Sequence, residues 1–337
     1  MKSIRTEKIN HPSAWKGSVI KNDDSWIYRL TLEDIQEIED ALGNVRMKGL
    51  SLTDTNCEFT IEDFPLPNFS ATIEKFANEI EGGRGFLLIK GLPVDKYSEE
   101  ESSVIFYGLG LHMGTPITQN SEGHLLGHVK SQGLNIDNAN VRGYQTNSHL
   151  PFHTDLSDVV GLLCLNKAKS GGHSTIVSSM AVYNEMLEKY PEYLGVLCND
   201  FYFDKRGEEN PGESPVRTSP IFSSHEGFVS SLYVRGYIES AQLKTNKLLS
   251  KIEIEALDIL DSLLVREDMR LDMDLEPGDI QLINNFTILH SRTEYVDYTE
   301  PKLWRHLLRL WLNLPNARPI SPSIEFIREG FKPRINA

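Results

Sequence analysis

The chain has 337 residues, of which 39% are hydrophobic, and its 48 acidic residues outnumber its 34 lysines and arginines, which gives a formal net charge of −14. This excess of negative charge repels a nucleic-acid backbone and no basic cluster offsets it locally, so nucleic acid is not expected as a partner. No apolar stretch approaches the roughly 20 residues of a membrane-spanning helix and residues 1–20 are too polar for a signal peptide, so we expect a soluble, cytoplasmic protein without a membrane partner.

The N-terminal part of the chain is predicted to be mainly helical. Apolar residues recur at helical spacing in the segments 31–45, 70–80 and 98–111. Between the second and the third segment, Gly82 and Gly83 break the pattern, and the apolar run 85–89 is typical of a buried strand. We therefore expect a helix to lead directly into the first strand of the core.

The remainder of the chain is predicted to be mostly β. The stretch 116–143 is polar and weakly periodic, which indicates loops with short strands such as 125–129. Aromatic and β-branched residues between glycines and prolines indicate an antiparallel sheet over 198–234. The other expected strands are 159–165, 174–177, 271–275, 280–284 and 307–312, the pair around 276–279 forming a hairpin, and the expected helices are 181–194 and 251–265.

No internal repeat, low-complexity tract or long linker marks a domain boundary, so one domain over residues 1–337 is predicted. We expect a mainly β (α+β) fold with flanking helices, in which 1–84 form a helical N-terminal decoration, 85–314 the β core and 315–337 a C-terminal tail. Short strands with added helices are typical of a barrel or jelly roll. The widely spaced Cys57, Cys164 and Cys198 indicate neither a disulfide framework nor a thiolate metal site.

His153 and Asp155 are the first candidates for chemistry. They stand just before the apolar run 159–165, and residues two apart in an extended chain point to the same face. His290 follows another apolar strand 137 residues further on. Two imidazoles and one carboxylate form a facial triad that leaves positions on a ferrous ion for a bidentate cosubstrate and dioxygen. Taken alone, the short pattern is equally that of a core or capping histidine with a turn aspartate.

The surroundings of these residues resemble the taurine and 2,4-dichlorophenoxyacetate dioxygenase (TauD/TfdA) family of iron(II)/2-oxoglutarate-dependent oxygenases. Five features match in order, namely 150–155, the apolar strand 159–165, Gly171-Gly172-His173-Ser174, the turn 277–279 that leads to His290, and 305–309. The resemblance covers residues 85–314. It implies a distorted jelly roll, or double-stranded β-helix, with iron(II) bound by His153, Asp155 and His290.

The resemblance also places 2-oxoglutarate. A hydroxyl residue after the two glycines is expected to contact its far carboxylate, and Ser174 occupies that place, with Thr175 as the alternative because the family usually has an acidic residue and then Thr there. An arginine is expected as the second anchor, since a planar guanidinium matches a carboxylate bidentately. Arg305 fits, 15 residues after His290, whereas Arg292 is a rival that we expect to face elsewhere.

Arg309 and the segment before His153 are expected near the substrate. Arg309 lies four residues beyond Arg305, so in a strand the two share a face, and Arg309 binds either the cosubstrate or an anionic group of the substrate. Tyr144, Gln145 and Asn147 are the other candidates for lining the substrate pocket. Three further histidines, which we interpret as isolated surface or core groups, are His112, His124 and His128.

The function implied by the resemblance is that of a dioxygenase that oxidises a C–H bond of a small metabolite, most simply by hydroxylation, while 2-oxoglutarate becomes succinate and CO2. A carboxylate on that metabolite is one option that the sequence leaves open. Asp155 favours oxygenation over halogenation, because related halogenases have a small residue there. Two other classes stay open, a non-catalytic barrel that binds a metal or a small anion and a zinc-dependent hydrolase. The sequence also leaves open whether the chain forms a homo-oligomer.

Overall fold

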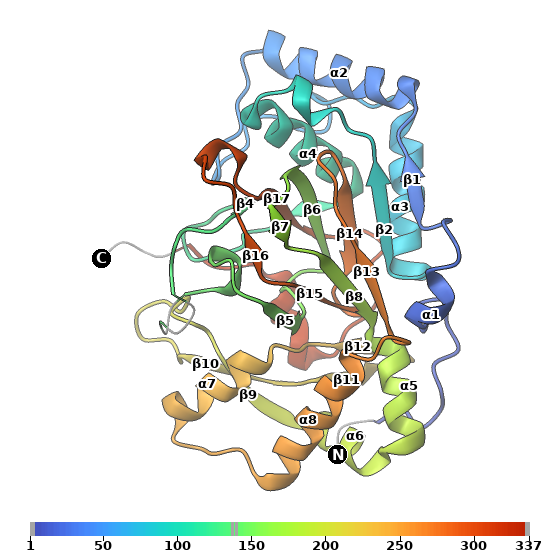
Figure 1. The fold of residues 1–337 in the computed structure, drawn as a ribbon, viewed down its shortest axis with the longest axis vertical. Helices are drawn as coiled ribbons and strands as arrows, with labels where there is room; N and C mark the ends of the chain where they lie inside the picture. Colours follow the sequence, from blue (N-terminus) through green and yellow to red (C-terminus); the bar gives the residue numbers. More distant parts are fainter. Residues whose placement is uncertain (1–3, 136–137, 139–140, 334–337) are drawn as a thin grey trace.

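The computed structural model describes residues 4–135, 138 and 141–333, and Figure 1 shows β-strands at its centre with helices gathered at two ends. The larger sheet contains seven described strands in the order β1-β2-β14-β6-β17-β3, with β4 paired to β17 outside this path. These strands are β1 (Ile27–Arg29), β2 (Phe86–Lys90), β3 (Thr115–Pro116), β4 (Leu126–Val129), β6 (Val159–Asn166), β14 (Ile280–Asn284) and β17 (His306–Asn313).

A smaller sheet and three strand pairs complete the described β-structure. The smaller sheet has the order β13-β8-β15-β5. Its strands are β5 (Leu150–His153), β8 (Ser174–Ser178), β13 (Arg270–Met273) and β15 (Ile288–Arg292). The pairs are β7 (Ser170–Gly171) with β16 (Tyr295–Val296), β9 (Asp200–Asp204) with β10 (Val216–Pro220), and β11 (Phe222–His225) with β12 (Phe228–Ser231).

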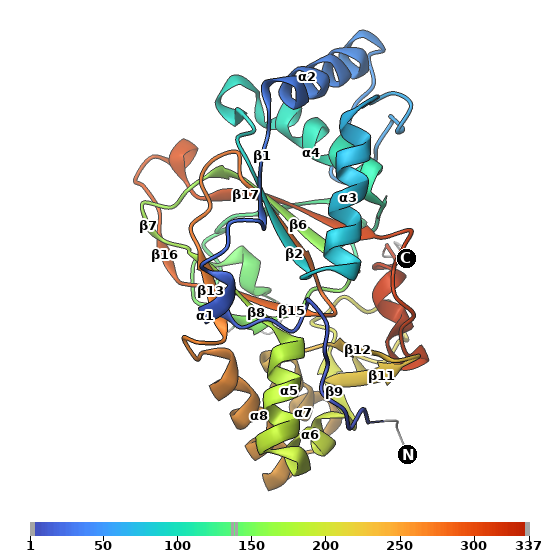
Figure 2. The same ribbon diagram turned by 90° about the vertical axis from the view of Figure 1, so that its right-hand side faces the viewer.

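The helices form two groups (Figure 2). The first group is α2 (Leu32–Met47), α3 (Phe69–Gly82) and α4 (Glu99–Met113), and the second is α5 (Ser179–Lys189), α6 (Pro191–Leu197), α7 (Arg235–Thr245) and α8 (Lys251–Leu264). The short helix α1 (Gly17–Ile20) lies apart from both, beside β13. Short 3-10 turns are η1 (Val94–Lys96), η2 (Gly143–Gln145), η3 (Pro301–Leu303) and η4 (Pro322–Arg328). In the described part of the chain, no helix has both the length and the apolar character needed to cross a bilayer.

Strand β17 shows how the layers are packed. Its residues Leu308 and Leu310 point toward α2, α3 and α4 and join the apolar core on that side of the larger sheet. Its alternate residues Leu307 and Trp311 point the other way, into a core that also contains Ile176 of the smaller sheet. Because side chains alternate along a strand, an almost continuous apolar run is required where both faces are buried. The two sheets therefore face each other across a shared interior.

The predicted hairpin around residues 276–279 is wrong. β13 pairs with β8 in the smaller sheet, whereas β14 pairs with β2 and β6 in the larger one, so the turn leads from one sheet to the other. Gly278 has a φ of 88°, and a Cβ there would collide with the Leu92 carbonyl. The glycine is therefore needed for this change of sheet and not for a local two-strand turn.

Other segments differ from the prediction in detail. The single helix expected over 181–194 is two helices, α5 and α6, because Pro191 starts a new helix after Tyr190 leaves the helical conformation. The region 198–234 contains two separate strand pairs, and α7 after it is not predicted by the sequence. Most of 116–143 is loop as expected, although residues 136, 137, 139 and 140 lie outside the described part.

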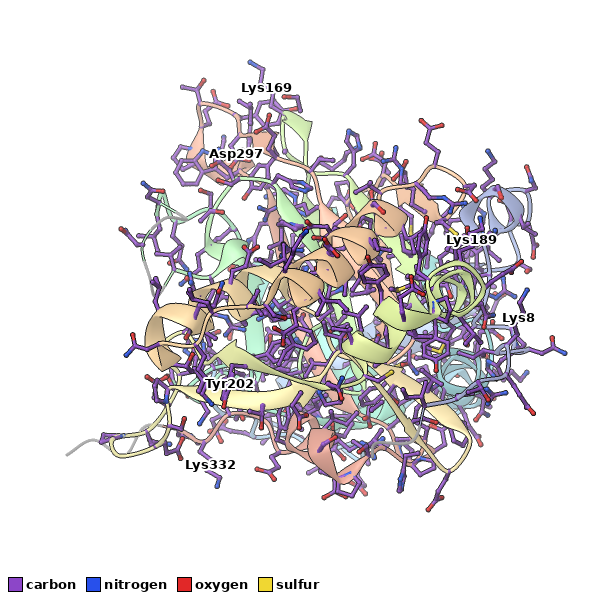
Figure 3. All side chains as sticks on the ribbon, turned by 90° about the horizontal axis from the view of Figure 1, so that it is seen from below. Lys8, Lys169, Lys189, Tyr202, Asp297 and Lys332 are labelled. Carbon is purple, nitrogen blue, oxygen red and sulfur yellow. The ribbon has the colours of Figure 1, made fainter. Side chains whose placement is uncertain are left out.

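Both ends of the described chain are held against the core. Near the beginning, Lys8 forms an ion pair with Glu188 at 2.6 Å, and Figure 3 shows Lys8 and Lys189 on the same side of the molecule, next to α5. Toward the end, the expected tail is packed as far as it is described, since η4 buries Ile324 and Ile327. Residues 334–337 of that tail lie outside the described residues.

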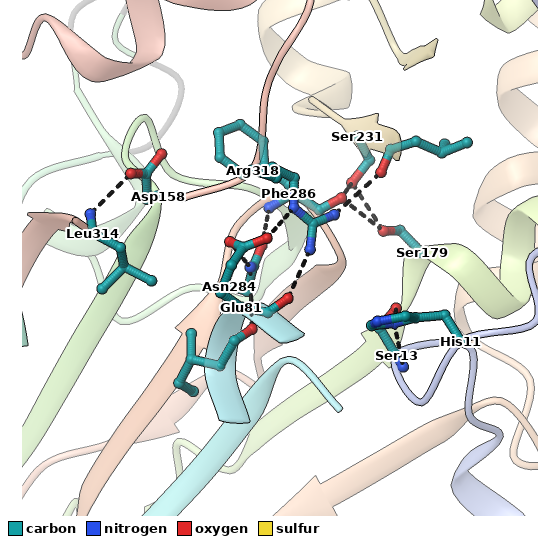
Figure 4. A network of polar contacts seen from close by, with 12 residues as sticks. His11, Ser13, Glu81, Asp158, Ser179, Ser231, Asn284, Phe286, Leu314 and Arg318 are labelled. Atoms are coloured by element: carbon teal, nitrogen blue, oxygen red, sulfur yellow. Dashed lines mark hydrogen bonds and ion pairs between the residues drawn. The ribbon is translucent and has the colours of Figure 1, made fainter. Parts of the chain in front are cut away.

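A buried polar network fixes the turn between β14 and β15 (Figure 4). Asn284 accepts a hydrogen bond from the Phe286 backbone N–H at 2.9 Å and donates to Glu81 at 3.0 Å. Arg318 in turn donates from Nε to the Glu81 carboxylate at 2.6 Å. Removing one partner of such a network leaves a buried polar group unsatisfied, so the turn is held in one conformation. The turn carries Asn285, which supports the site described next.

Candidate metal centre

His153 and His290 are brought together by strand pairing. His153 ends β5, His290 lies in the middle of β15, and the two are directly opposite in the antiparallel register. Directly opposite residues of neighbouring strands have side chains within reach of each other on one face of the sheet. The centroids of the two imidazole rings are 4.1 Å apart. The pairing of β5 with β15 therefore brings together two histidines that are 137 residues apart in the sequence.

Asp155 is placed by contacts from the turn after β14 and from β17. Its backbone N–H donates to the Asn285 side-chain oxygen at 3.1 Å, and Asn285 also donates to the Ser157 carbonyl at 3.1 Å. Its carboxylate accepts hydrogen bonds from Trp311 Nε1 at 3.0 Å and from Arg309 Nη1 at 3.4 Å. The result is that ligand atoms of His153, Asp155 and His290 all lie within 4.8 Å of one another.

The protonation states of these three residues suit a metal. Burial lowers the pKa of His290 to about 3, and His153 also repels the charged form. Burial likewise lowers the pKa of His153. Burial raises the pKa of Asp155, but the charge of Arg309 and the two histidines lower it further, so the pKa is about 2. At neutral pH the site therefore offers two neutral imidazoles and one carboxylate without prior loss of protons.

Hydrogen bonding also leaves nitrogen atoms free for a metal. His153 Nδ1 lies 2.9 Å from the Pro151 carbonyl, so this nitrogen carries the proton and Nε2 keeps its lone pair. His290 Nδ1 is buried and has no hydrogen-bond partner among the described residues. Two imidazole nitrogens and a carboxylate that leave part of the coordination sphere open are the ligand set of non-haem iron(II) oxygenases. The residues present therefore fit an iron(II) ion.

A cavity of about 400 Å³ lies beside the triad and is lined by His153, Asp155 and Tyr144. Its wall is mainly apolar, and among its charged side chains the cations outnumber the carboxylates of Asp155, Asp204 and Glu208; the cations are Arg142, Lys205, Arg206, Arg217, Arg235 and Arg309. Gln145 and Asn147 do not line this cavity. Asn147 donates to the Tyr295 carbonyl at 3.2 Å, and Gln145 Oε1 accepts from the Arg142 backbone N–H at 2.9 Å. Of the three expected pocket residues, Tyr144 alone lines the cavity.

Two buried arginines, Arg292 and Arg305, meet over the ring of Tyr295. Arg305 lies over the Tyr295 ring at 5.1 Å, and Arg292 lies over the same ring at 4.9 Å. Arg305 Nη1, Arg292 Nε and Arg292 Nη1 have no hydrogen-bond partners among the described residues. Burial followed by repulsion from Arg305 lowers the pKa of Arg292 to about 10. Arg292 was expected to face elsewhere, and this expectation is wrong: it lies two residues after His290 in β15 and shares its face.

The two hydroxyl residues after the Gly171-Gly172 turn point in opposite directions. Ser174 donates to Gln281 of β14 at 3.0 Å, inside the space between the sheets, and it stands directly opposite Arg292 in the β8–β15 register. Thr175 instead donates to Asp272 at 2.7 Å on the other face. The arrangement favours Ser174, and not Thr175, as the hydroxyl next to the arginine pair.

Asn285 is a positioning residue that the sequence analysis missed. Its amide is satisfied by Asp155 and Ser157, so the Asn285→Ala variant is expected to keep the fold and to bind iron(II) about 10- to 100-fold more weakly. Anaerobic iron(II) titration of the variant measures this, with the thermal midpoint followed in parallel. An unchanged iron affinity would show that Asp155 is held by Trp311 and Arg309 alone.

The sequence and the fold were both compared with those of known proteins. A family model described as "Taurine catabolism dioxygenase TauD, TfdA family" matches residues 48–311. FR-33289 synthase from Streptomyces rubellomurinus is 33% identical over 336 residues, which cover 98% of each chain. Among solved structures, asparagine oxygenase in complex with Fe(II), hydroxyasparagine and succinate has a TM-score of 0.66 at 15% identity, covering 92% of this chain and 100% of that one. The iron oxygenase OrfP in complex with Fe and alpha-ketoglutaric acid has a TM-score of 0.60 at 12% identity, over 85% and 94% of the two chains.

Proposed function

Because the chain belongs to the taurine catabolism dioxygenase TauD, TfdA family and is an iron(II)/2-oxoglutarate-dependent dioxygenase, we propose that His153, Asp155 and His290 are its iron ligands. The observation that carries this assignment is the convergence of their ligand atoms within 4.8 Å. Iron(II) bound there, with 2-oxoglutarate and dioxygen, supplies the oxidant for a substrate C–H bond and yields succinate and CO2. The two facing sheets support a distorted jelly roll as the finer description of the fold, in one domain.

The far carboxylate of 2-oxoglutarate is proposed to lie between Arg305 and Arg292. Three guanidinium nitrogens of this pair are buried without a partner, and two like charges this close need an anion between them. Arg292 follows His290 by two residues in β15, and two residues of a strand span about 7 Å, the length of a five-carbon dicarboxylate. Ser174, opposite Arg292, contributes a hydroxyl at the same end.

Spectroscopy tests the metal and cosubstrate sites together. Adding 2-oxoglutarate to the anaerobic iron(II) protein is expected to produce a weak visible charge-transfer band, because the cosubstrate chelates the metal through its carboxylate and keto oxygens. The His290→Ala variant serves as the control that lacks one ligand. Absence of the band in folded, iron-loaded wild-type protein would contradict the proposed ligand set.

The substrate is proposed to be a small metabolite with an anionic group, such as a carboxylate or a phosphate. Arg217 lines the cavity, and its guanidinium stacks on Phe326 at 4.6 Å and makes no side-chain hydrogen bond or salt bridge within the described part of the chain. Burial lowers the pKa of Arg217, so its charge is incompletely compensated. Arg309 faces the same cavity from β17, beside Asp155. An anionic group of the substrate offsets these charges and directs the remainder of the molecule toward the triad.

A substrate screen scored by succinate release tests this class, with amino acids, carboxylates and phosphate esters as the first candidates. With the best substrate, Arg217→Gln is expected to raise the substrate KM about 10-fold or more and to leave the 2-oxoglutarate KM unchanged, since a hydrogen bond to a charged group contributes about 1.5–3 kcal/mol. Arg46→Gln on α2 is the matched surface control. Preference for an uncharged substrate, or an unchanged KM, would contradict the proposal.

A further inference from the structure

A second group of metal-binding side chains lies where β4 and β17 run side by side, on residues that the iron site does not use. His128 of β4 and His306 of β17 come together with Glu99 from the first turn of α4, and one ligand atom of each lies within 4.8 Å of the others. His128 Nδ1 is 2.9 Å from His306 Nε2. The two imidazole rings are 5.1 Å apart at an angle of 37°, so they are not stacked face to face.

Asp54 fixes the orientation and the tautomer of His128. Its Oδ1 lies 3.2 Å from His128 Nε2, which therefore carries the proton and donates to the carboxylate. His128 Nδ1 then has a lone pair directed toward His306 and Glu99. A carboxylate that holds the remote nitrogen of a histidine is the usual support of a metal-binding imidazole, because it sets the tautomer and increases the basicity of the ligand.

Glu99 places one oxygen near each ring. Its Oε1 is 3.5 Å from His128 Nδ1, and its Oε2 is 3.7 Å from His306 Nδ1. In the absence of a cation, His306 must donate from Nε2 to His128, which leaves its Nδ1 lone pair facing a carboxylate oxygen. With a cation between the two rings, His306 Nε2 becomes a ligand and Nδ1–H donates to Glu99, so every polar atom of the group is satisfied.

We propose that His128, His306 and Glu99 form a second site for a divalent transition metal of the zinc class, with Asp54 as the carboxylate that orients His128. Two imidazole nitrogens and one carboxylate oxygen, completed by water, match the ligands and the coordination number that Zn2+ prefers. His306 is buried, whereas Glu99 is half exposed, so solvent has access to the site from the side of α4. The bound ion links α4, β4 and β17, three elements that are separate in the sequence.

The site is tested in a background that lacks the iron ligands. The full-length His153→Ala/His290→Ala variant, stripped of metal with a chelator, is dialysed against Zn2+ and analysed for bound metal. We expect one tightly bound equivalent, compared with two for the wild type, and none after His128→Ala is added. His225→Ala, which removes a solvent-accessible histidine of β11, is the matched control and is expected to retain the equivalent.

Two further variants keep the test decisive if His128→Ala disturbs the fold. Asp54→Asn is expected to weaken Zn2+ binding about 10- to 100-fold, the usual effect of removing a carboxylate behind a metal-binding histidine. Glu99→Gln removes a ligand from an exposed helix end, and Zn2+ is expected to raise the thermal midpoint of the background variant but not of the Glu99→Gln form. Absence of bound zinc in the background variant, or binding that survives both His128→Ala and Glu99→Gln, would overturn the proposal. Neither readout depends on turnover.

Discussion

Asp155→Ala is expected to abolish substrate-dependent succinate formation, with a fall in turnover on the order of 10³-fold or more. Loss of the carboxylate weakens a metal centre that supplies several kcal/mol of transition-state stabilisation, and each 1.36 kcal/mol corresponds to about a factor of ten. The variant also leaves Arg309 Nη1 and Trp311 Nε1 without the Asp155 carboxylate as acceptor, although Arg309 Nε still donates to Gln119. Turnover and iron content are measured together, so that loss of metal is distinguished from loss of activity with metal bound.

A second variant at Asp155 tests whether its negative charge is required, and a surface variant serves as the control. Asp155→Asn keeps an acceptor for Trp311 but removes the negative charge, and we expect it to bind iron(II) poorly and to be equally inactive. Asp268→Ala removes a surface carboxylate that pairs with Arg266 at 2.8 Å, and its activity is expected to equal that of the wild type. Normal turnover in folded Asp155→Ala protein would rule out the triad.

Arg305→Ala and Arg292→Ala are each expected to raise the KM for 2-oxoglutarate about 30-fold or more, with a smaller effect on kcat at saturation. Truncating one partner of a buried charge pair costs about 2 kcal/mol or more, which corresponds to that factor. The measurement is succinate release at varied 2-oxoglutarate. Arg266→Ala, which removes a guanidinium at the protein surface, is the control.

A purely structural role for Arg292 predicts a different result. Its Nη2 donates to the Thr146 carbonyl at 2.9 Å, so removal of the side chain also loosens the segment before β5. If that contact is its only role, Arg292→Ala lowers the thermal midpoint and leaves the 2-oxoglutarate KM unchanged. Arg292→Lys retains the positive charge but lacks the planar guanidinium that binds a carboxylate through two hydrogen bonds. Relative to Arg292→Ala, it is therefore expected to restore the thermal midpoint more fully than the affinity for 2-oxoglutarate.

The residues that the sequence identifies best are those whose local spacing carries the information. His153 and Asp155 are two apart in an extended segment and His290 ends an apolar stretch. This pattern is weak on its own, and the resemblance of the surrounding motifs to the TauD/TfdA family is what implies that the three form one ligand set. The alternation rule that linked Arg305 to Arg309 applies equally to His290 and Arg292. Applied there, it predicts that Arg292 lies on the same face as His290, so the sequence carries this signal too.

Other features depend on contacts that no local pattern encodes. Pro277 and Gly278 are typical of a tight hairpin, and only the pairing of β13 with β8 shows that the chain changes sheet at that turn. Asn285 lies in a turn, where asparagine is common, and nothing near it in the sequence indicates the bond to Asp155. His128 and His306 are 178 residues apart, and each looks isolated until β4 pairs with β17.

The register match between β5 and β15 has a consequence for how the protein acquires its metal. Among the described residues β5 is an edge strand of the smaller sheet that pairs with β15, and His153 also forms an isolated bridge with Val234, so His153 lies next to His290 only when β5 is paired with β15. Closing a loop of this length costs conformational entropy before the contact between the strands stabilises the chain, so pairings of such long sequence separation slow folding. The proposed ligand set is therefore complete only when β5 and β15 are paired, and iron binding is expected to follow the pairing of these two strands.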